Sequence, residues 1–275
     1  MPELPEVETI RQDMIKKVKG KKIKKVKVKD GRNIKILSPS EFQKKLVGKT
    51  IEDIERRGKF LILHLSSNEL LIFHLKLTGR LLFFSKEIEK EPDYTRIIFT
   101  FTDESKLFFT DMRVFAEVIL IPQDEIESID AIKNMGPEPL SSDFTCEKFK
   151  EILRGKKGKI KPLLMDQTVL AGIGNIYSQE ALYRAGIHPE RPVSKLSEKE
   201  IELLYQALVE VLKEAIKYRG SSVDAYVDLD GKEGEFVPHL RVYGREGQRC
   251  FRCNFPIKKK KIGGRGTYFC SQCQK

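Results

Sequence analysis

Hydrophobic and polar positions follow two different periods along the chain. Near the N-terminus, Val7, Ile10, Met14 and Val18 recur every three or four residues, and Pro5 suits the first turn of a helix. This spacing predicts one amphipathic helix that begins almost at the first residue.

After this helix the pattern changes to short apolar or alternating runs that are typical of β-strands. Several strands of this length, joined by short turns, predict a β-sandwich or a barrel-like domain. The runs are IKKVKVK (23–29), FLILHL (60–65), LLIFHLKL (70–77), RIIFTFT (96–102), KLFFTD (106–111) and FAEVILI (115–121).

A lysine-rich stretch overlaps the first of these strands. Nine lysines lie between Lys16 and Lys29, which is the density of a nucleic-acid-binding tract. The lysines nevertheless alternate with Ile23, Val26 and Val28, so the solvent-exposed face of a strand is the simpler interpretation.

Helical patterns replace the strands beyond residue 130. GPEPL (136–140) is a Pro/Gly connector, and the last long helical pattern ends at Gly220, ahead of a polar segment that starts at Ser221. We therefore expect an N-terminal β domain over 1–130, a linker over 131–145, a helical domain over 146–235 and a cysteine-containing C-terminal segment over 236–275.

Four of the five cysteines form two CxxC pairs, Cys250 with Cys253 and Cys270 with Cys273, which are separated by sixteen residues. This spacing is that of a four-thiolate zinc finger or ribbon. Two disulfides are the alternative, but thiols stay reduced in the cytoplasm, which favours one structural Zn²⁺. The intervening KKKKIGGRGTYF is basic and contains a glycine turn, so a metal would fix a positively charged hairpin.

Composition narrows the classes of function. The chain has 275 residues, 40% hydrophobic and 33% charged, which suits one large or two medium domains. No apolar run approaches the length of a membrane span, and no signal-peptide core is evident, so we expect a cytoplasmic protein without a membrane partner. The net charge of +11 favours a polyanionic partner, although surplus lysine also raises solubility.

The opening PELPEVE is followed in order by RRGKF (56–60), HLKLTG (74–79), TDMRVF (110–115), AGIGNIYSQEAL (171–182) and the paired cysteines. This order resembles that of bacterial formamidopyrimidine-DNA glycosylases over essentially the whole chain. The resemblance implies an α+β multidomain fold, with an N-terminal β-sandwich and N-terminal helix, then a helix-two-turns-helix DNA-binding domain with a C-terminal four-cysteine zinc finger.

The same resemblance implies a bifunctional enzyme of base excision repair. Such an enzyme removes oxidised purines (8-oxoguanine and formamidopyrimidines) from double-stranded DNA and cleaves the strand at the abasic site by β,δ-elimination. It would act as a monomer, bound to the bacterial nucleoid through its DNA contacts, with no redox or nucleotide cofactor.

Pro2 is the expected nucleophile, because removal of Met1 would leave it as a free secondary amine. An α-amino group titrates near about 7.7 to 8.0, well below a lysine at about 10.4, so an appreciable fraction is unprotonated at neutral pH. Attack on the sugar C1′ displaces the damaged base, and a secondary amine then gives a cationic iminium that acidifies the C2′ proton.

The resemblance assigns further catalytic roles. Glu3 matches the acid/base residue that protonates the sugar as its ring opens, and Lys59 matches a lysine that contacts the phosphate and assists proton transfer. Arg265 matches the finger arginine that acts in the second elimination. Glu6 also matches an active-site position, but the helix dipole by itself explains an acidic residue in a first helical turn.

Extrusion of a damaged nucleotide leaves a void in the duplex, which apolar wedges and arginines commonly fill. Leu77, Arg113 and Phe115 fall at the three void-filling positions of the resembled family. Methionine is usual where Leu77 stands. For Leu77 and Phe115, packing in the protein core is the alternative.

Two residues of the second half match DNA contacts. Asn175 matches a phosphate-binding asparagine after a glycine turn, where helix N-terminal amides also favour an anion, and Lys156 matches a basic DNA contact. Two positions depart from the pattern: Pro92 stands where a DNA-contacting histidine is usual, and Val114 where a second arginine is usual.

Two other functions stay open at this point. One is an endonuclease VIII-type glycosylase for oxidised pyrimidines, whose chain typically begins Pro-Glu-Gly-Pro. The other is a non-catalytic, zinc-dependent DNA-binding protein.

Overall fold

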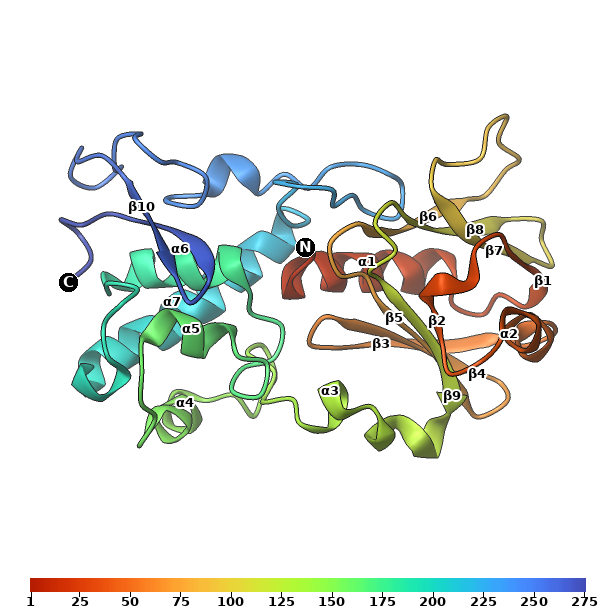
Figure 1. Cartoon of the computed structure of the whole chain (residues 1–275), viewed down its shortest axis with the longest axis horizontal. Helices are drawn as coiled ribbons and strands as arrows, with labels where there is room; N and C mark the ends of the chain where they lie inside the picture. Colours follow the sequence, from red (N-terminus) through yellow and green to blue (C-terminus); the bar gives the residue numbers. More distant parts are fainter. The chain divides into compact units, whose positions relative to one another are not determined.

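The computed structural model describes residues 1–275 as two compact units (Figure 1). The first comprises Met1–Lys133 and Tyr218–Glu235, and the second comprises Asn134–Lys217 and Phe236–Lys275. None of the helices combines the length and the apolar character that crossing a lipid bilayer requires.

The predicted N-terminal helix is present as α1 (Leu4–Lys17). Pro5 lies in its first turn, and Val7, Ile10 and Met14 are each at most 1% exposed. Burial of this apolar stripe in the core shared with the β-strands stabilises the helix, which explains how it forms so close to the chain terminus.

Two β-sheets form the bulk of the first unit. One sheet has the strand order β1-β7-β8-β6 and the other has the order β2-β9-β5-β4-β3. The strands are β1 (Ile23–Val28), β2 (Ile34–Lys35), β3 (Ile51–Arg57), β4 (Phe60–Leu65), β5 (Glu69–His74), β6 (Gly79–Phe84), β7 (Thr95–Phe101), β8 (Lys106–Asp111) and β9 (Glu117–Pro122).

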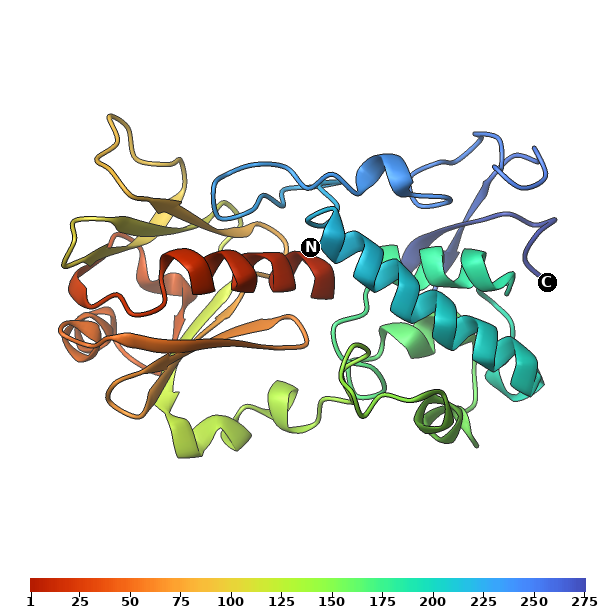
Figure 2. The same cartoon turned by 180° about the vertical axis from the view of Figure 1, so that it is seen from behind.

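One hydrophobic core joins both sheets and α1. Phe73 of β5 packs at 6.2 Å from Phe99 of β7 and at 5.8 Å from Phe109 of β8, measured between ring centroids. Figure 2 shows α1 running along the side of this two-sheet layer. The predicted β-sandwich with an N-terminal helix is therefore confirmed.

The strands β2, β3 and β6 and the helices α2 (Pro39–Leu46) and α3 (Asp130–Lys133) of this unit were not predicted. In β3 (IEDIERR) only Ile51 and Ile54 are buried, because the strand lies at a sheet edge, so the sequence lacks the usual alternation. In β1 the isoleucine and valine at 23 and 26 are buried and the neighbouring lysines are exposed, as the interpretation of a solvent-exposed face requires.

The second unit is helical with one β-hairpin. Its long helix α7 buries Leu204, Leu208, Val211 and Leu212 along one stripe and ends at Lys217, slightly before the predicted end. The hairpin lies beside α6 (Figure 1). The elements are α4 (Cys146–Leu153), α5 (Ile160–Met165), α6 (Asn175–Ala185), α7 (Glu198–Lys217), β10 (Lys258–Ile262) and β11 (Arg265–Phe269); the short α3 (Asp130–Lys133) ends the preceding stretch of the first unit.

The segment Tyr218–Glu235 groups with the first unit, whereas the sequence placed it in the helical range 146–235. Tyr226 and Leu229 belong to the hydrophobic core of the sandwich, and Phe83 N–H donates to the Leu229 carbonyl at 2.8 Å. Long-range packing thus places the segment Tyr218–Glu235 in the first unit.

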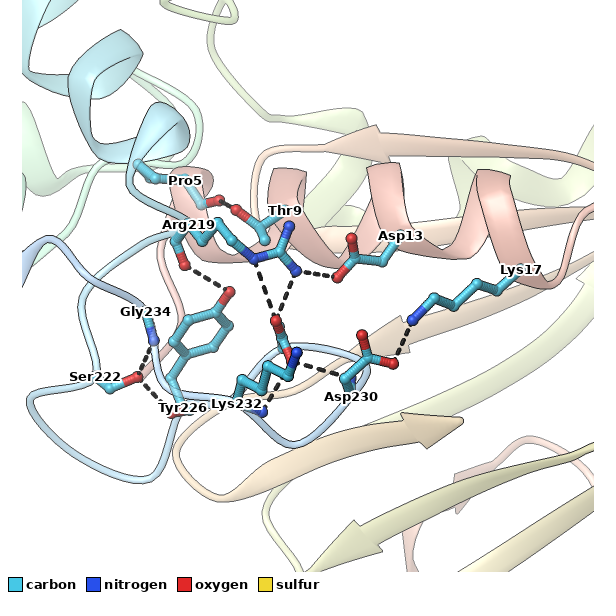
Figure 3. A network of polar contacts seen from close by, with 11 residues as sticks. Pro5, Thr9, Asp13, Lys17, Arg219, Ser222, Tyr226, Asp230, Lys232 and Gly234 are labelled. Carbon is cyan, nitrogen blue, oxygen red and sulfur yellow. Dashed lines mark hydrogen bonds and ion pairs between the residues drawn. The ribbon is translucent and has the colours of Figure 1, made fainter. Parts of the chain in front are cut away.

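Polar contacts hold the same segment against α1 (Figure 3). The Arg219 guanidinium lies 2.5 Å from Asp13 of α1 and 2.6 Å from Asp228, whose side chains are 7% and 2% exposed. Lys17 pairs with Asp230 one turn further along the helix.

Candidate functional site

The residues before α1 are buried and capped. Pro2 and Glu3 are buried, and the Glu3 N–H donates to Glu6 Oε2 at 2.8 Å. This contact belongs to a capping box between the residue that precedes the helix and its third residue. With Met1 present, its amino group lies 3.4 Å from Asp224. The capped helix start thus gives Pro2 and Glu3 a fixed backbone.

Glu6 binds backbone on two sides. Its Oε2 accepts from Glu3, and its Oε1 accepts from the Ser221 N–H at 2.8 Å. A Cβ at Gly220 would come within 2.8 Å of Glu6 Oε1, so the close approach requires glycine there. Glu6 therefore anchors the segment after α7 to the start of α1. Its direct role in chemistry stays a prediction.

Lys59 lies in the two-residue turn that joins β3 to β4 and is only 6% exposed. Gly58 takes a φ of +56° in this turn. The Arg56 guanidinium donates to the Gly58 carbonyl at 2.9 Å and lies 3.1 Å from Glu8 of α1. The Arg56–Glu8 pair therefore fixes the turn that carries Lys59 against the helix that carries Glu6. Sequence reasoning missed both residues of that pair.

His74 ends β5 opposite Phe60, with their rings 4.5 Å apart. Burial, together with the positive charges of Lys76 and Lys59, lowers the pKa of His74 to about 3. Its Nδ1 accepts from the Lys76 N–H at 3.2 Å. The imidazole is thus a neutral neighbour of the lysines at neutral pH.

The three void-filling candidates reach solvent to different degrees. Arg113 is exposed, Phe115 is 56% exposed and Leu77 is partly buried. A phenylalanine ring with this exposed fraction is not part of the hydrophobic core. Core packing therefore does not explain Phe115.

Asp111, a residue that sequence reasoning did not single out, shapes the loop that carries two of these candidates. It is fully buried and accepts from Thr78 Oγ1 at 2.5 Å, from Asn33 Nδ2 at 2.9 Å and from the Ala116 N–H at 2.9 Å. The Arg113 N–H donates to Thr78 Oγ1 at 3.1 Å. An aspartate as the last residue of a buried strand was the available signal.

In the second unit, Asn175 is the first residue of α6. Its Oδ1 accepts from Lys161 Nζ at 2.7 Å, and Lys161 is fully buried. Lys156 is exposed on a loop between Gly155 and Gly158, both of which have positive φ. The helix start therefore combines the positive end of the α6 dipole with a buried ammonium, an arrangement that suits an anion.

The four predicted cysteine ligands come together. Their Sγ atoms lie within 4.8 Å of one another, with 3.8 Å between Cys250 and Cys273 and 3.4 Å between Cys253 and Cys270. The S–S distance in a disulfide is about 2.05 Å, so neither of these pairs is a disulfide. Thiolates at about 2.3 Å from a tetrahedral ion are separated by about 3.8 Å, so the cluster fits one metal ion.

Arg265 begins β11 directly after the two-residue turn Gly263–Gly264, in which both residues have positive φ. Its side chain is exposed. The first unit thus carries Pro2, Glu3 and Lys59 and the second carries Arg265.

Two family models match this chain. The model of the formamidopyrimidine-DNA glycosylase N-terminal domain matches residues 1–118, and that of the formamidopyrimidine-DNA glycosylase H2TH domain matches residues 135–227. The formamidopyrimidine-DNA glycosylase of Pelotomaculum thermopropionicum is 43% identical over 275 residues, covering 100% of this chain and 99% of that protein.

Two solved structures are similar over the whole chain. A complex of Lactococcus lactis Fpg with DNA containing an abasic site has a TM-score of 0.90 and 39% identity, with 99% of each chain covered. A complex of a mutant of that Fpg with DNA containing Fapy-dG has a TM-score of 0.91 and 39% identity, with 100% of each chain covered. The chain belongs to the formamidopyrimidine-DNA glycosylase family.

Proposed function

We propose that this protein is a bifunctional DNA glycosylase and abasic-site lyase that removes oxidised purines from double-stranded DNA. The observation that carries the proposal is membership of the family over the full length, joined to the buried Pro2 and Glu3 at the capped start of α1. Solved relatives in complex with Fapy-dG or abasic-site DNA support the substrate class.

In the proposed reaction, Met1 is removed and the Pro2 nitrogen attacks the sugar C1′. The new N–C1′ bond replaces the glycosidic bond, and the base leaves with a proton. The nitrogen lone pair then forms the N=C1′ bond of an iminium as the C1′–O4′ bond breaks; the electron pair of that bond goes to O4′, which Glu3 protonates. The resulting iminium at C1′ withdraws electrons from C2′, whose proton is lost as the 3′ phosphate departs. Base excision and the first strand cleavage thus share one covalent intermediate.

The other candidates assist this chemistry. Lys59, held by its turn at the end of β3, is proposed to contact the lesion phosphate and assist proton transfer. Arg265 is proposed to promote the second elimination, in which the 5′ phosphate departs. Glu6 serves by fixing the backbone of Glu3, as its contact at 2.8 Å supports.

Binding is proposed to rest on two groups of residues. Asn175 and Lys156 contact phosphates near the lesion, and Asn175 does so at the positive end of the α6 dipole. Leu77, Arg113 and Phe115 fill the void that the extruded nucleotide leaves, and the exposure of Phe115 supports this role.

The metal of the four-cysteine cluster is proposed to be one structural Zn²⁺. An all-cysteine set whose sulfurs lie within 4.8 Å of one another suits this ion, and a closed set of four ligands leaves no position for substrate. Its role is to hold the hairpin that presents Arg265. Metal analysis of purified protein is expected to give one zinc per chain.

Borohydride trapping tests the proposed function. With a duplex that contains an abasic site, the wild-type protein should form a reduced covalent adduct, and Pro2→Gly should form none. Absence of an adduct with the wild type would overturn the enzymatic proposal in favour of a non-catalytic DNA-binding protein. Release of thymine glycol as fast as 8-oxoguanine would instead favour the pyrimidine-specific alternative.

A further inference from the structure

We infer that Gln179 is a positioning residue for Arg265. Its side-chain amide replaces a missing neighbouring strand along the outer edge of β11 and so fixes the residue that follows the hairpin turn. The inference rests on the proposed role of Arg265 in the second elimination and goes beyond it by naming what holds that arginine in place.

The contacts of Gln179 meet the backbone of β11 at two points. Gln179 lies on α6 and is 1% exposed. Its Oε1 accepts from the Tyr268 N–H at 2.5 Å, and its Nε2 lies 3.3 Å from the Gly266 carbonyl. One amide therefore binds a C=O and the N–H two residues further on, which is the pattern of an adjacent strand.

The hairpin needs such a partner because β11 pairs only with β10. Gly266 lies opposite Lys261 and Tyr268 opposite Lys259, and the outer edge of β11 has no strand beside it. The Gln179 amide supplies the hydrogen bonds that a neighbouring strand would give to the Gly266 carbonyl and the Tyr268 N–H. Loss of the amide would therefore let this edge shift toward water or toward a new partner.

Arg265 lies between two fixed points. On one side, a Cβ at Gly263 would come within 2.9 Å of Pro162 Cγ, so the turn packs closely on α5. On the other side, the Gly266 carbonyl accepts from Gln179 Nε2 and, at 3.2 Å, from Asn175 Nδ2. The backbone on both sides of Arg265 is thus held by the helices beneath the hairpin.

The same amide links Arg265 to the proposed phosphate site. Gln179 Nε2 lies 3.0 Å from Asn175 Oδ1 and 2.6 Å from the Asn175 carbonyl, so its two N–H groups are shared among three acceptors. The orientation of Asn175 and the position of β11 are therefore coupled through one side chain. A displacement of about 1 Å at a reacting group can cost about 100-fold in rate, so this coupling matters for chemistry.

The test compares Gln179→Ala and Gln179→Glu with Arg265→Ala and with Gln274→Ala. Gln274 is the matched control: it is 2% exposed, accepts from the Cys270 N–H at 2.8 Å and donates to the Ile187 carbonyl at 2.9 Å. It clamps the same finger beyond the opposite end of β11. Each variant is incubated with a duplex containing an abasic site, and the β- and δ-elimination products are separated by electrophoresis.

We expect Gln179→Ala to lower the ratio of δ to β product by about tenfold or more, in the direction of Arg265→Ala, with little change in the rate of borohydride trapping. Gln179→Glu should do the same, because it retains the acceptor for Tyr268 but loses the donors to Gly266. Gln274→Ala should leave the ratio within about twofold of the wild type.

An unchanged product ratio in Gln179→Ala, or an equal fall in Gln274→Ala, would overturn the inference. Zinc content is measured for each variant. If Gln179→Ala loses its metal, the ratio of δ to β product in Gln179→Glu tests the inference instead, because that variant keeps the side-chain length. Failure of the wild type to form a trapped adduct would refute the proposed function instead, which keeps the two failures distinct.

Discussion

Acidification should destabilise the protein through His74 before its carboxylates titrate. The partly buried imidazole is neutral in the folded state, with a pKa of about 3, against 6.5 for an unperturbed histidine. The unfolded chain therefore binds a proton that the folded chain does not as the pH falls below 6.5. Stability from this residue is fully present above that value and is lost progressively toward the folded-state pKa.

The size of the effect follows from these two values. Between about pH 7.5 and about pH 5, the difference in proton binding corresponds to a loss of about 2 kcal/mol. Because the side chain is only partly shielded from water, we expect about 1 to 2 kcal/mol. Burial also lowers the pKa of His188, which therefore adds a contribution of the same sign.

The assay is urea unfolding followed by circular dichroism across this pH range, on the wild type and on His74→Asn. Asparagine can still accept from the Lys76 N–H, so the variant removes the titrating group and keeps its hydrogen bond. The wild type should lose about 1 to 2 kcal/mol more than the variant on acidification. Parallel stability curves for the two proteins would refute the reasoning.

Two further predictions concern buried carboxylates. Arg219→Met leaves Asp13 and Asp228 without their guanidinium and should lower the free energy of unfolding by about 2 to 3 kcal/mol, less than for a fully buried pair because Arg219 is 38% exposed. Lys17→Met, which removes an exposed pair, should change it by less than about 0.5 kcal/mol, and equal losses would contradict this account. Asp111→Asn exchanges an acceptor for a donor facing the Ala116 N–H and should lower kcat/KM for lesion excision by about tenfold. Cleavage of an abasic site should fall less, because no base must be displaced, and an equal fall in both would show that Asp111 does not act through the void-filling loop.

Much of the fold follows from local pattern. The stripe of Val7, Ile10 and Met14 predicted α1, and most strands of the sandwich appear as apolar runs. The edge strand β3 and the short helix α2 were not predicted, because each has only two buried hydrophobic positions and therefore little periodicity. The predicted domain boundaries at 130, 145 and 235 stay predictions, and the segment Tyr218–Glu235 packs where the sequence pattern did not place it.

The sequence by itself determined the parts of this protein that repeat or lie close along the chain. Cys250 and Cys253 are three residues apart, and so are Cys270 and Cys273, so a ligand set is visible without coordinates. Glu3 and Glu6 lie three residues apart, and their capping relation is equally local.

Only the tertiary structure decided which polar groups lose water and find distant partners. Glu6 binds Ser221 across 215 positions of sequence, and Gln179 binds Tyr268 across 89. In the sequence Lys59 cannot be told from the many surface lysines, whereas in the structure the β3–β4 turn buries it. The physical reason is that a buried polar group must be satisfied by whatever the fold brings beside it, and no local period records that partner.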